Sequence, residues 1–190
     1  MGPTILTVGH STRSADGFLA LLQAHAIEHL VDVRRYPASR RYPHFAKDPL
    51  AATLAQSGVG YTHEPDLGGR RSARRDSPNV GIRSASLRGY ADHALSEAFD
   101  GALRRLITQA ARARTAVMCA EAVPWRCHRQ IIADHLVARG LEVMHILGEA
   151  RLEPHRLSPL ARVTKHGGVV YPDAGGQIEL WAGGGVRRRA

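Results

Sequence analysis

Ionisable side chains gather in one short stretch of the chain, residues 116–129, which reads AVMCAEAVPWRCHR. The stretch holds both cysteines of the protein, together with a carboxylate, a histidine and two arginines. A thiol can act as a nucleophile or a metal ligand, and a carboxylate can take a proton from water. The side chains here that could do chemistry are Cys119, Glu121, Trp125, Arg126, Cys127, His128 and Arg129.

The stretch is predicted to begin in a buried strand and to end in a helix. Residues 115–119 are an apolar run, a proline-containing turn follows, and residues 127–140 carry apolar side chains at helical spacing. Strand, turn and helix make up half of a βαβ unit. Ligands of open α/β sheets bind beyond the carboxyl ends of the strands, which is where this turn would lie.

The same arrangement occurs nearer the N-terminus. Residues 5–8 are predicted to form a strand that ends in a glycine-containing turn, and a helix follows over 16–25. A second strand over 30–33 runs directly into a loop rich in arginine and tyrosine, residues 34–45. The candidate site residues at these two strand ends are His10, Ser11, Arg13, Asp32, Arg34, Tyr36, Ser39, Arg40 and Phe45.

The rest of the chain continues the alternation of strands and helices. The remaining predicted elements are a helix over 49–57, a strand over 59–63, a helix over 90–113, a strand over 142–147 and a weak hairpin over 162–171. We therefore predict one α/β domain, residues 1–171, with an open, mostly parallel sheet of about five strands and helices on both faces. The arginine-rich segment 66–89 is expected to be a binding loop or a lid.

Three of the predicted strands, at 5–8, 30–33 and 115–119, should place their following turns in one crevice. The carboxyl ends of adjacent parallel strands lie about 5 Å apart. Arginines in such a crevice suit phosphate groups, and aromatic rings suit stacking on a base. The combination indicates a site for a nucleotide or a nucleic acid.

Two of the chemistries open to this crevice need no metal. A carboxylate, Glu121 or Asp32, would assist cleavage of a glycosidic bond, with His10 or His128 orienting the water. Alternatively, Cys119 would be the nucleophile of a phosphatase or sulfurtransferase acting on small anions. The spacing from Cys119 to the next arginine is one residue longer than in the phosphatase loop, so the match is weak.

A zinc site is the third chemistry to consider. Its four ligands could be assembled from Cys119, Cys127, His128 and His10. The sequence lacks the paired, closely spaced Cys or His ligands of common zinc sites. Carboxylate-assisted cleavage uses the largest number of the candidate site residues and requires the fewest added groups. We therefore expect neither a metal nor another cofactor.

The charge of the chain favours a polyanionic partner. Lys and Arg number 26 against 17 Asp and Glu, which gives a net charge of +9. A basic surface without a specific partner is the alternative interpretation. No apolar stretch approaches the roughly 20 residues that span a bilayer, and the N-terminus lacks a signal-peptide pattern, so we expect a cytoplasmic protein with no membrane contact. We also expect a monomer.

Several of these motifs together resemble one protein family. They are residues 7–13 (TVGHSTR), residues 30–34 (LVDVR) with Pro37, Ser39 and Phe45, residues 67–69 (LGG), and residues 118–121 (MCAE) with 127–129 (CHR). In this order, over about residues 4–171, they closely resemble the domain of unknown function 488 family. The resemblance implies a compact α/β fold with an active site at these residues. The family name supplies no reaction.

The tail, residues 172–190, is rich in glycine and arginine and need not fold. Within it, residues 177–181 (QIELW) resemble the bacterial sliding-clamp-binding pentapeptide, Gln-Leu-Ser/Asp-Leu-Phe. Gln177, Leu180 and Trp181 would be the residues that contact the clamp. A short edge strand is the alternative. A clamp ligand would tether the protein to DNA and raise its local concentration there.

Taken together, these patterns predict a DNA-acting base-processing or repair enzyme, most concretely an N-glycosylase for a damaged or modified base. The DNA backbone would be held by Arg13, Arg34, Arg40 and Arg129. The extruded base would stack on Tyr36, Phe45 or Trp125. The alternatives are the Cys119-dependent enzyme and a DNA-recognition module without catalysis.

Overall fold

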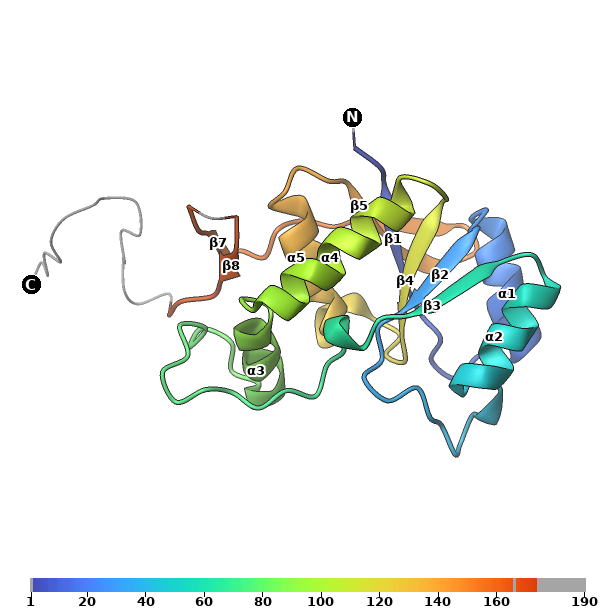
Figure 1. Cartoon of the computed structure of the whole chain (residues 1–190), viewed down its shortest axis with the longest axis horizontal. Helices are drawn as coiled ribbons and strands as arrows, with labels where there is room; N and C mark the ends of the chain where they lie inside the picture. Colours follow the sequence, from blue (N-terminus) through green and yellow to red (C-terminus); the bar gives the residue numbers. More distant parts are fainter. Residues whose placement is uncertain (1, 166, 174–190) are drawn as a thin grey trace, which may run out of the picture.

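The computed structural model describes residues 2–165 and 167–173. A six-stranded sheet runs through the centre in the order β3-β2-β4-β1-β5-β6 (Figure 1). The first five strands of this order are parallel, and β6 is antiparallel to β5. The strands are β1 (Ile5–Gly9), β2 (His29–Asp32), β3 (Gly60–His63), β4 (Thr115–Cys119), β5 (Val143–Gly148) and β6 (Arg151–Pro154). A separate hairpin pairs β7 (Arg162–Val163) with β8 (Val169–Val170).

Helices cover both faces of the sheet, so the predicted single α/β domain is confirmed. Helices α1 and α2 lie on one side, and α3, α4 and α5 lie on the other (Figure 1). Their bounds are α1 (Ala15–Ala24), α2 (Lys47–Gln56), α3 (Ala85–His93), α4 (Glu97–Ala110) and α5 (Arg129–Val137). Short 3-10 turns are η1 (Pro43–Phe45), η2 (Pro65–Leu67) and η3 (Pro124–Arg126).

Each face of the sheet carries its own apolar layer. Successive side chains of a strand point to opposite faces. Accordingly, Leu6 and Leu30 belong to the core beneath α1 and α2, whereas Ile5 and Val31 belong to the core beneath α3, α4 and α5. The central strands are buried along their whole length, which explains why they appear in the sequence as continuous apolar runs.

The prediction of one long helix over 90–113 was wrong. The chain forms α3 and α4 there, and Ser96 begins the second helix because its side chain accepts a hydrogen bond from the Phe99 amide. The sheet has six strands rather than about five, since β6 adds an antiparallel edge to β5. The helix predicted from residue 127 begins at Arg129, so Cys127 and His128 belong to the turn before it.

Among the described residues, no helix combines the length and apolar character needed to cross a membrane. The clamp-like pentapeptide at 177–181 lies outside the described residues.

Candidate active site

The turns after β1, β2 and β4 meet at the carboxyl edge of the sheet. Strands β2, β4 and β1 are neighbours, and the main-chain amides of His10 and Ser11 donate to the carbonyls of Cys119 and Ala120, each at 2.9 Å. A pocket of about 760 Å³ opens at this edge. The predicted site residues that line it are His10, Ser11, Arg34, Tyr36, Ser39, Cys119, Glu121 and His128.

Two predicted phosphate-binding arginines instead bond to the protein's own main chain. Nη1 of Arg13 donates to the carbonyl of Gly9 at 3.0 Å. Arg129 is 1% exposed, and its Nη2 donates to the carbonyls of Glu121 and Ala122. Neither arginine lines the pocket. Both therefore hold the turns that carry the pocket residues.

Three other predicted residues also lie away from the pocket wall. Phe45 is fully buried and stacks on the ring of His10, with ring centroids 4.1 Å apart, so it cannot stack on a base. Arg40 and Trp125 are exposed without lining the pocket. Of the predicted aromatic residues, Tyr36 is the one that is both exposed and in the pocket wall.

The carboxylate of Asp32 lies beneath the pocket in a buried ion pair. Its Oδ1 accepts from Nε of Arg34 at 2.9 Å, and its Oδ2 accepts from Nη2 of Arg34 at 2.6 Å and from the hydroxyl of Tyr61 at 2.8 Å. Asp32 is 0% exposed and Arg34 is 8% exposed. Burial alone would lower the pKa of Arg34, but the hydrogen bonds and charge of Asp32 raise it. Asp32 thus positions a permanently charged guanidinium in the pocket wall.

His10 lies against that guanidinium and is a neutral imidazole. Its Nδ1 donates to the carbonyl of Ser11 at 3.0 Å, since a carbonyl can only accept, and this leaves Nε2 to accept from Nη1 of Arg34 at 3.4 Å. Burial and the charge of Arg34 lower the pKa of His10 to about 4. His10 is therefore a hydrogen-bond acceptor at neutral pH, and its Nε2 helps to hold Nη1 of Arg34 in place.

This environment predicts that His10 does not titrate between pH 8 and pH 5. In the unfolded chain a histidine binds its proton near pH 6.5, whereas folded His10 binds it near 4. The stabilisation from burying the neutral ring is complete above pH 6.5 and decreases as the pH falls toward 4. An NMR titration, with the His10 signal assigned from the His10→Gln variant, checks this. A midpoint near 6.5 would contradict the buried contact with Arg34.

Glu121 is the single carboxylate among the residues that line the pocket. Its side chain is exposed, and Oε1 makes one long hydrogen bond, 3.4 Å from the amide of Val123. A Cβ atom on Gly9 would lie 2.0 Å from the carbonyl oxygen of Glu121, so glycine is needed for β1 to approach this turn. The carboxylate is consequently free to contact a ligand while its backbone is fixed.

The segment between η2 and α3 forms a further wall that sequence reasoning did not resolve. Gly69, Arg70 and Ser84 line the pocket from it. Arg70 has a φ of 58° and Ser11 has a φ of 50°, left-handed values that are uncommon outside glycine and that recur at functional sites. The arginine-rich composition predicted that this segment takes part in binding, but it did not predict which of its residues line the pocket.

The same segment is tied to α3 by one carboxylate, that of Asp92. Asp92 accepts from the amide of Arg74 at 2.8 Å, from the hydroxyl of Ser77 at 2.5 Å and from Nδ2 of Asn79 at 2.8 Å. Because of these bonds, the wall is an ordered part of the domain.

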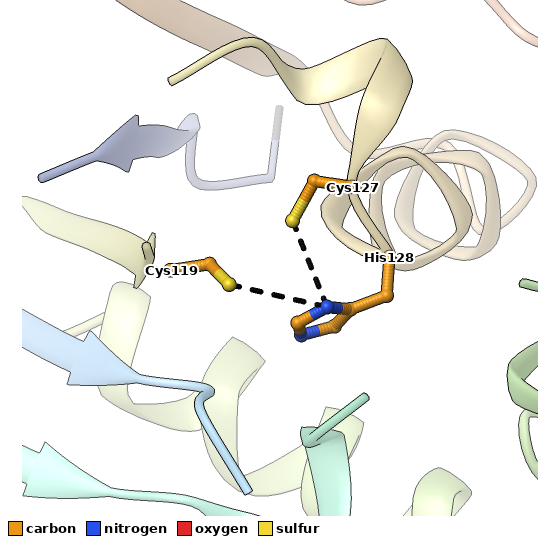
Figure 2. A group of neighbouring side chains, drawn as sticks. All are labelled: Cys119, Cys127 and His128. Carbon is orange, nitrogen blue, oxygen red and sulfur yellow. Dashed lines mark hydrogen bonds between the residues drawn. The ribbon is translucent and has the colours of Figure 1, made fainter. Parts of the chain in front are cut away.

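Both cysteines and His128 converge at the floor of the pocket. Figure 2 shows that both sulfur atoms contact the same ring nitrogen, Nδ1 of His128. This nitrogen lies 3.6 Å from Sγ of Cys127 and 4.0 Å from Sγ of Cys119. Nε2 of His128 donates to the carbonyl of Val33 at 3.0 Å, so Nδ1 presents its lone pair to the two sulfur atoms. Tyr90, which the sequence did not single out, packs edge-on against this ring with centroids 4.8 Å apart.

The two thiols differ in acidity. The proximity of the two sulfur atoms raises the pKa of Cys119 and lowers the pKa of Cys127, whereas burial raises the pKa of both thiols. His128 and Arg129 lower the pKa of Cys127 further. Cys127 is therefore the more acidic of the two thiols, whereas the sequence analysis predicts Cys119 as the nucleophile.

The comparison with protein families matches residues 14–136 to the profile described as "Domain of unknown function DUF488". The chain belongs to the DUF488 family. The DUF488 match includes β2, β4 and the turn between β4 and α5, and it begins after His10 and Ser11. Neither the curated proteins nor the solved structures include a match to the chain.

Proposed function

We propose that the protein acts on DNA as a base-processing or repair enzyme, and most concretely that it is an N-glycosylase for a damaged or modified base. The observation that carries the proposal is a cationic pocket with a single carboxylate, Glu121, in its wall. The lining arginines are Arg34, Arg35, Arg41, Arg70 and Arg126. A pocket of about 760 Å³ has the size of sites for nucleotide-scale ligands.

The charges support a phosphodiester substrate. Guanidinium groups bind phosphate oxygens in a planar, bidentate manner, and the arginines at the rim would hold the strand on both sides of an extruded nucleotide. Tyr36 is 61% exposed beside Arg35, whose guanidinium carbon lies 5.4 Å from the ring centroid. Tyr36 would stack on the base or on its neighbour.

Of the two candidate carboxylates, Glu121 is the one that suits the chemical step. Both oxygens of Asp32 are already bound by Arg34 and Tyr61. Glu121 would accept a proton from the attacking water while the water oxygen forms a bond to the sugar carbon. The carbon–nitrogen bond breaks, the electron pair leaves with the base, and the charge of Arg34 would stabilise the departing ring.

The tail adds independent support for work on DNA. The pentapeptide at 177–181 resembles a sliding-clamp ligand, and the net charge of +9 favours a polyanion. Tethering to the clamp would concentrate the enzyme on DNA.

Incubation with single- and double-stranded oligonucleotides that carry a panel of modified bases tests the proposal. Mass spectrometry of the small molecules and of the strands should reveal a freed base and an abasic strand for at least one substrate. Salt-sensitive binding with intact strands across the panel would instead favour a recognition module without catalysis.

A further inference from the structure

We propose that Cys119, Cys127 and His128 form a zinc site at the floor of the pocket, with three protein ligands and one coordination position open to the pocket. The inference goes beyond the proposed function and does not depend on it. Sγ of each cysteine and Nδ1 of the histidine lie within 4.8 Å of one another (Figure 2). All three residues are nearly buried, yet all three line the pocket.

The distances from the histidine nitrogen to the two sulfur atoms suit tetrahedral zinc. Zinc bonds of about 2.3 Å to sulfur and about 2.0 Å to nitrogen place a sulfur and a nitrogen ligand about 3.6 Å apart. The observed separations from Nδ1 are 3.6 Å for Cys127 and 4.0 Å for Cys119. Small rotations of the cysteine side chains would therefore complete the geometry.

His128 is held in the tautomer that a metal needs. Its Nε2 donates to the carbonyl of Val33 at 3.0 Å, which directs the free lone pair of Nδ1 at the two sulfur atoms. Such a bond to the second ring nitrogen is the usual support of a metal-binding histidine. A Cβ atom on Gly69 would lie 2.8 Å from Nδ1, so the glycine keeps the space beside the ligating nitrogen clear.

The type and charge of the ligands favour zinc. Two thiolates and one imidazole suit a borderline-soft divalent ion, whereas magnesium and calcium prefer oxygen. Nε of Arg129 donates to Sγ of Cys127 at 3.5 Å, which would stabilise a thiolate ligand. Three protein ligands with a fourth position open are typical of catalytic zinc, which when bound supplies a hydroxide from water at a pH of about 7.

Metal analysis of the full chain tests the site. The protein is purified with a phosphine reductant, loaded with zinc, dialysed and analysed by plasma mass spectrometry. We expect about one tightly bound zinc ion per chain. The variants Cys119→Ser, Cys127→Ser and His128→Gln should each lose it. His135→Gln is the matched control, because His135 is also buried on this side of the sheet but lies outside the cluster.

Two measurements on the unmutated chain decide the question even if a variant fails to fold. Cobalt in place of zinc should give the intense visible absorption of a tetrahedral site and a thiolate-to-cobalt charge-transfer band. Zinc should also slow the labelling of both cysteines by a thiol reagent. Substoichiometric zinc with no cobalt band, labelling unaffected by zinc, or a Cys119–Cys127 disulfide that resists the reductant would overturn the proposal. None of these readouts involves a DNA substrate, so failure here and failure of the glycosylase proposal are distinguishable.

Discussion

Replacing Glu121 by glutamine is expected to slow base release by about 10²- to 10⁴-fold, the usual contribution of a general acid or base. Glutamine has the same shape but cannot take a proton from water. The side chain is exposed and makes one long hydrogen bond, so the fold and the affinity for DNA should be nearly unchanged. Single-turnover kinetics and a binding titration on the same oligonucleotide measure the two effects separately.

The control for this experiment is Glu149→Gln. Glu149 is an exposed glutamate between β5 and β6 that does not line the pocket. The Glu149→Gln variant should retain full turnover. If the Glu121 variant lost DNA binding and turnover together, its role would be structural rather than chemical.

Asp32→Asn is expected to lower the free energy of unfolding by about 3–5 kcal/mol, the cost of removing one partner from a buried ion pair. The guanidinium of Arg34 would remain 8% exposed with its charge uncompensated. Tyr61 would also lose its bond to an anionic oxygen. Urea denaturation followed by circular dichroism measures the change.

The chain contains a matched control for the buried pair. Arg74 and Asp76 are also separated by two positions and form the same two-pronged contact, at 3.0 and 2.6 Å, but on the surface, where they are 58% and 73% exposed. Water screens that pair, so Asp76→Asn should leave stability nearly unchanged. Equal losses in the two variants would show that burial of the Asp32 pair has no energetic consequence.

The meeting of the three turns could be predicted from the sequence because it depends on strand type alone. Continuous apolar runs at β1, β2 and β4 indicate parallel strands, and parallel neighbours bring their carboxyl ends to one edge. Edge strand β6 could not be predicted in this way, because it is largely exposed and lacks an apolar alternation. The break before α4 had a local signal in Ser96, but the apolar pattern ran across it.

The roles of individual site residues needed the packing. Asp32 and Glu121 are equivalent as carboxylates in the sequence, and the difference between them arises from Arg34 and Tyr61, which occupy the oxygens of Asp32. The Cys–Cys–His cluster likewise depends on the path of the turn between β4 and α5, which returns Cys127 to the end of the strand that carries Cys119. Residue spacing does not encode that path.

The attachment of the pocket's outer wall to Asp92 has a consequence for how the protein can diversify. The donors that fix this wall are Arg74, Ser77 and Asn79, whereas the residues that face the pocket are Gly69, Arg70 and Ser84. Anchoring and ligand contact thus fall on separate sets of positions. Substrate preference can change through exchange of the exposed Arg70 side chain at little cost in folding, whereas Ser84 also caps α3 by accepting a hydrogen bond from the Leu87 amide. Relatives with one scaffold can therefore select different ligands.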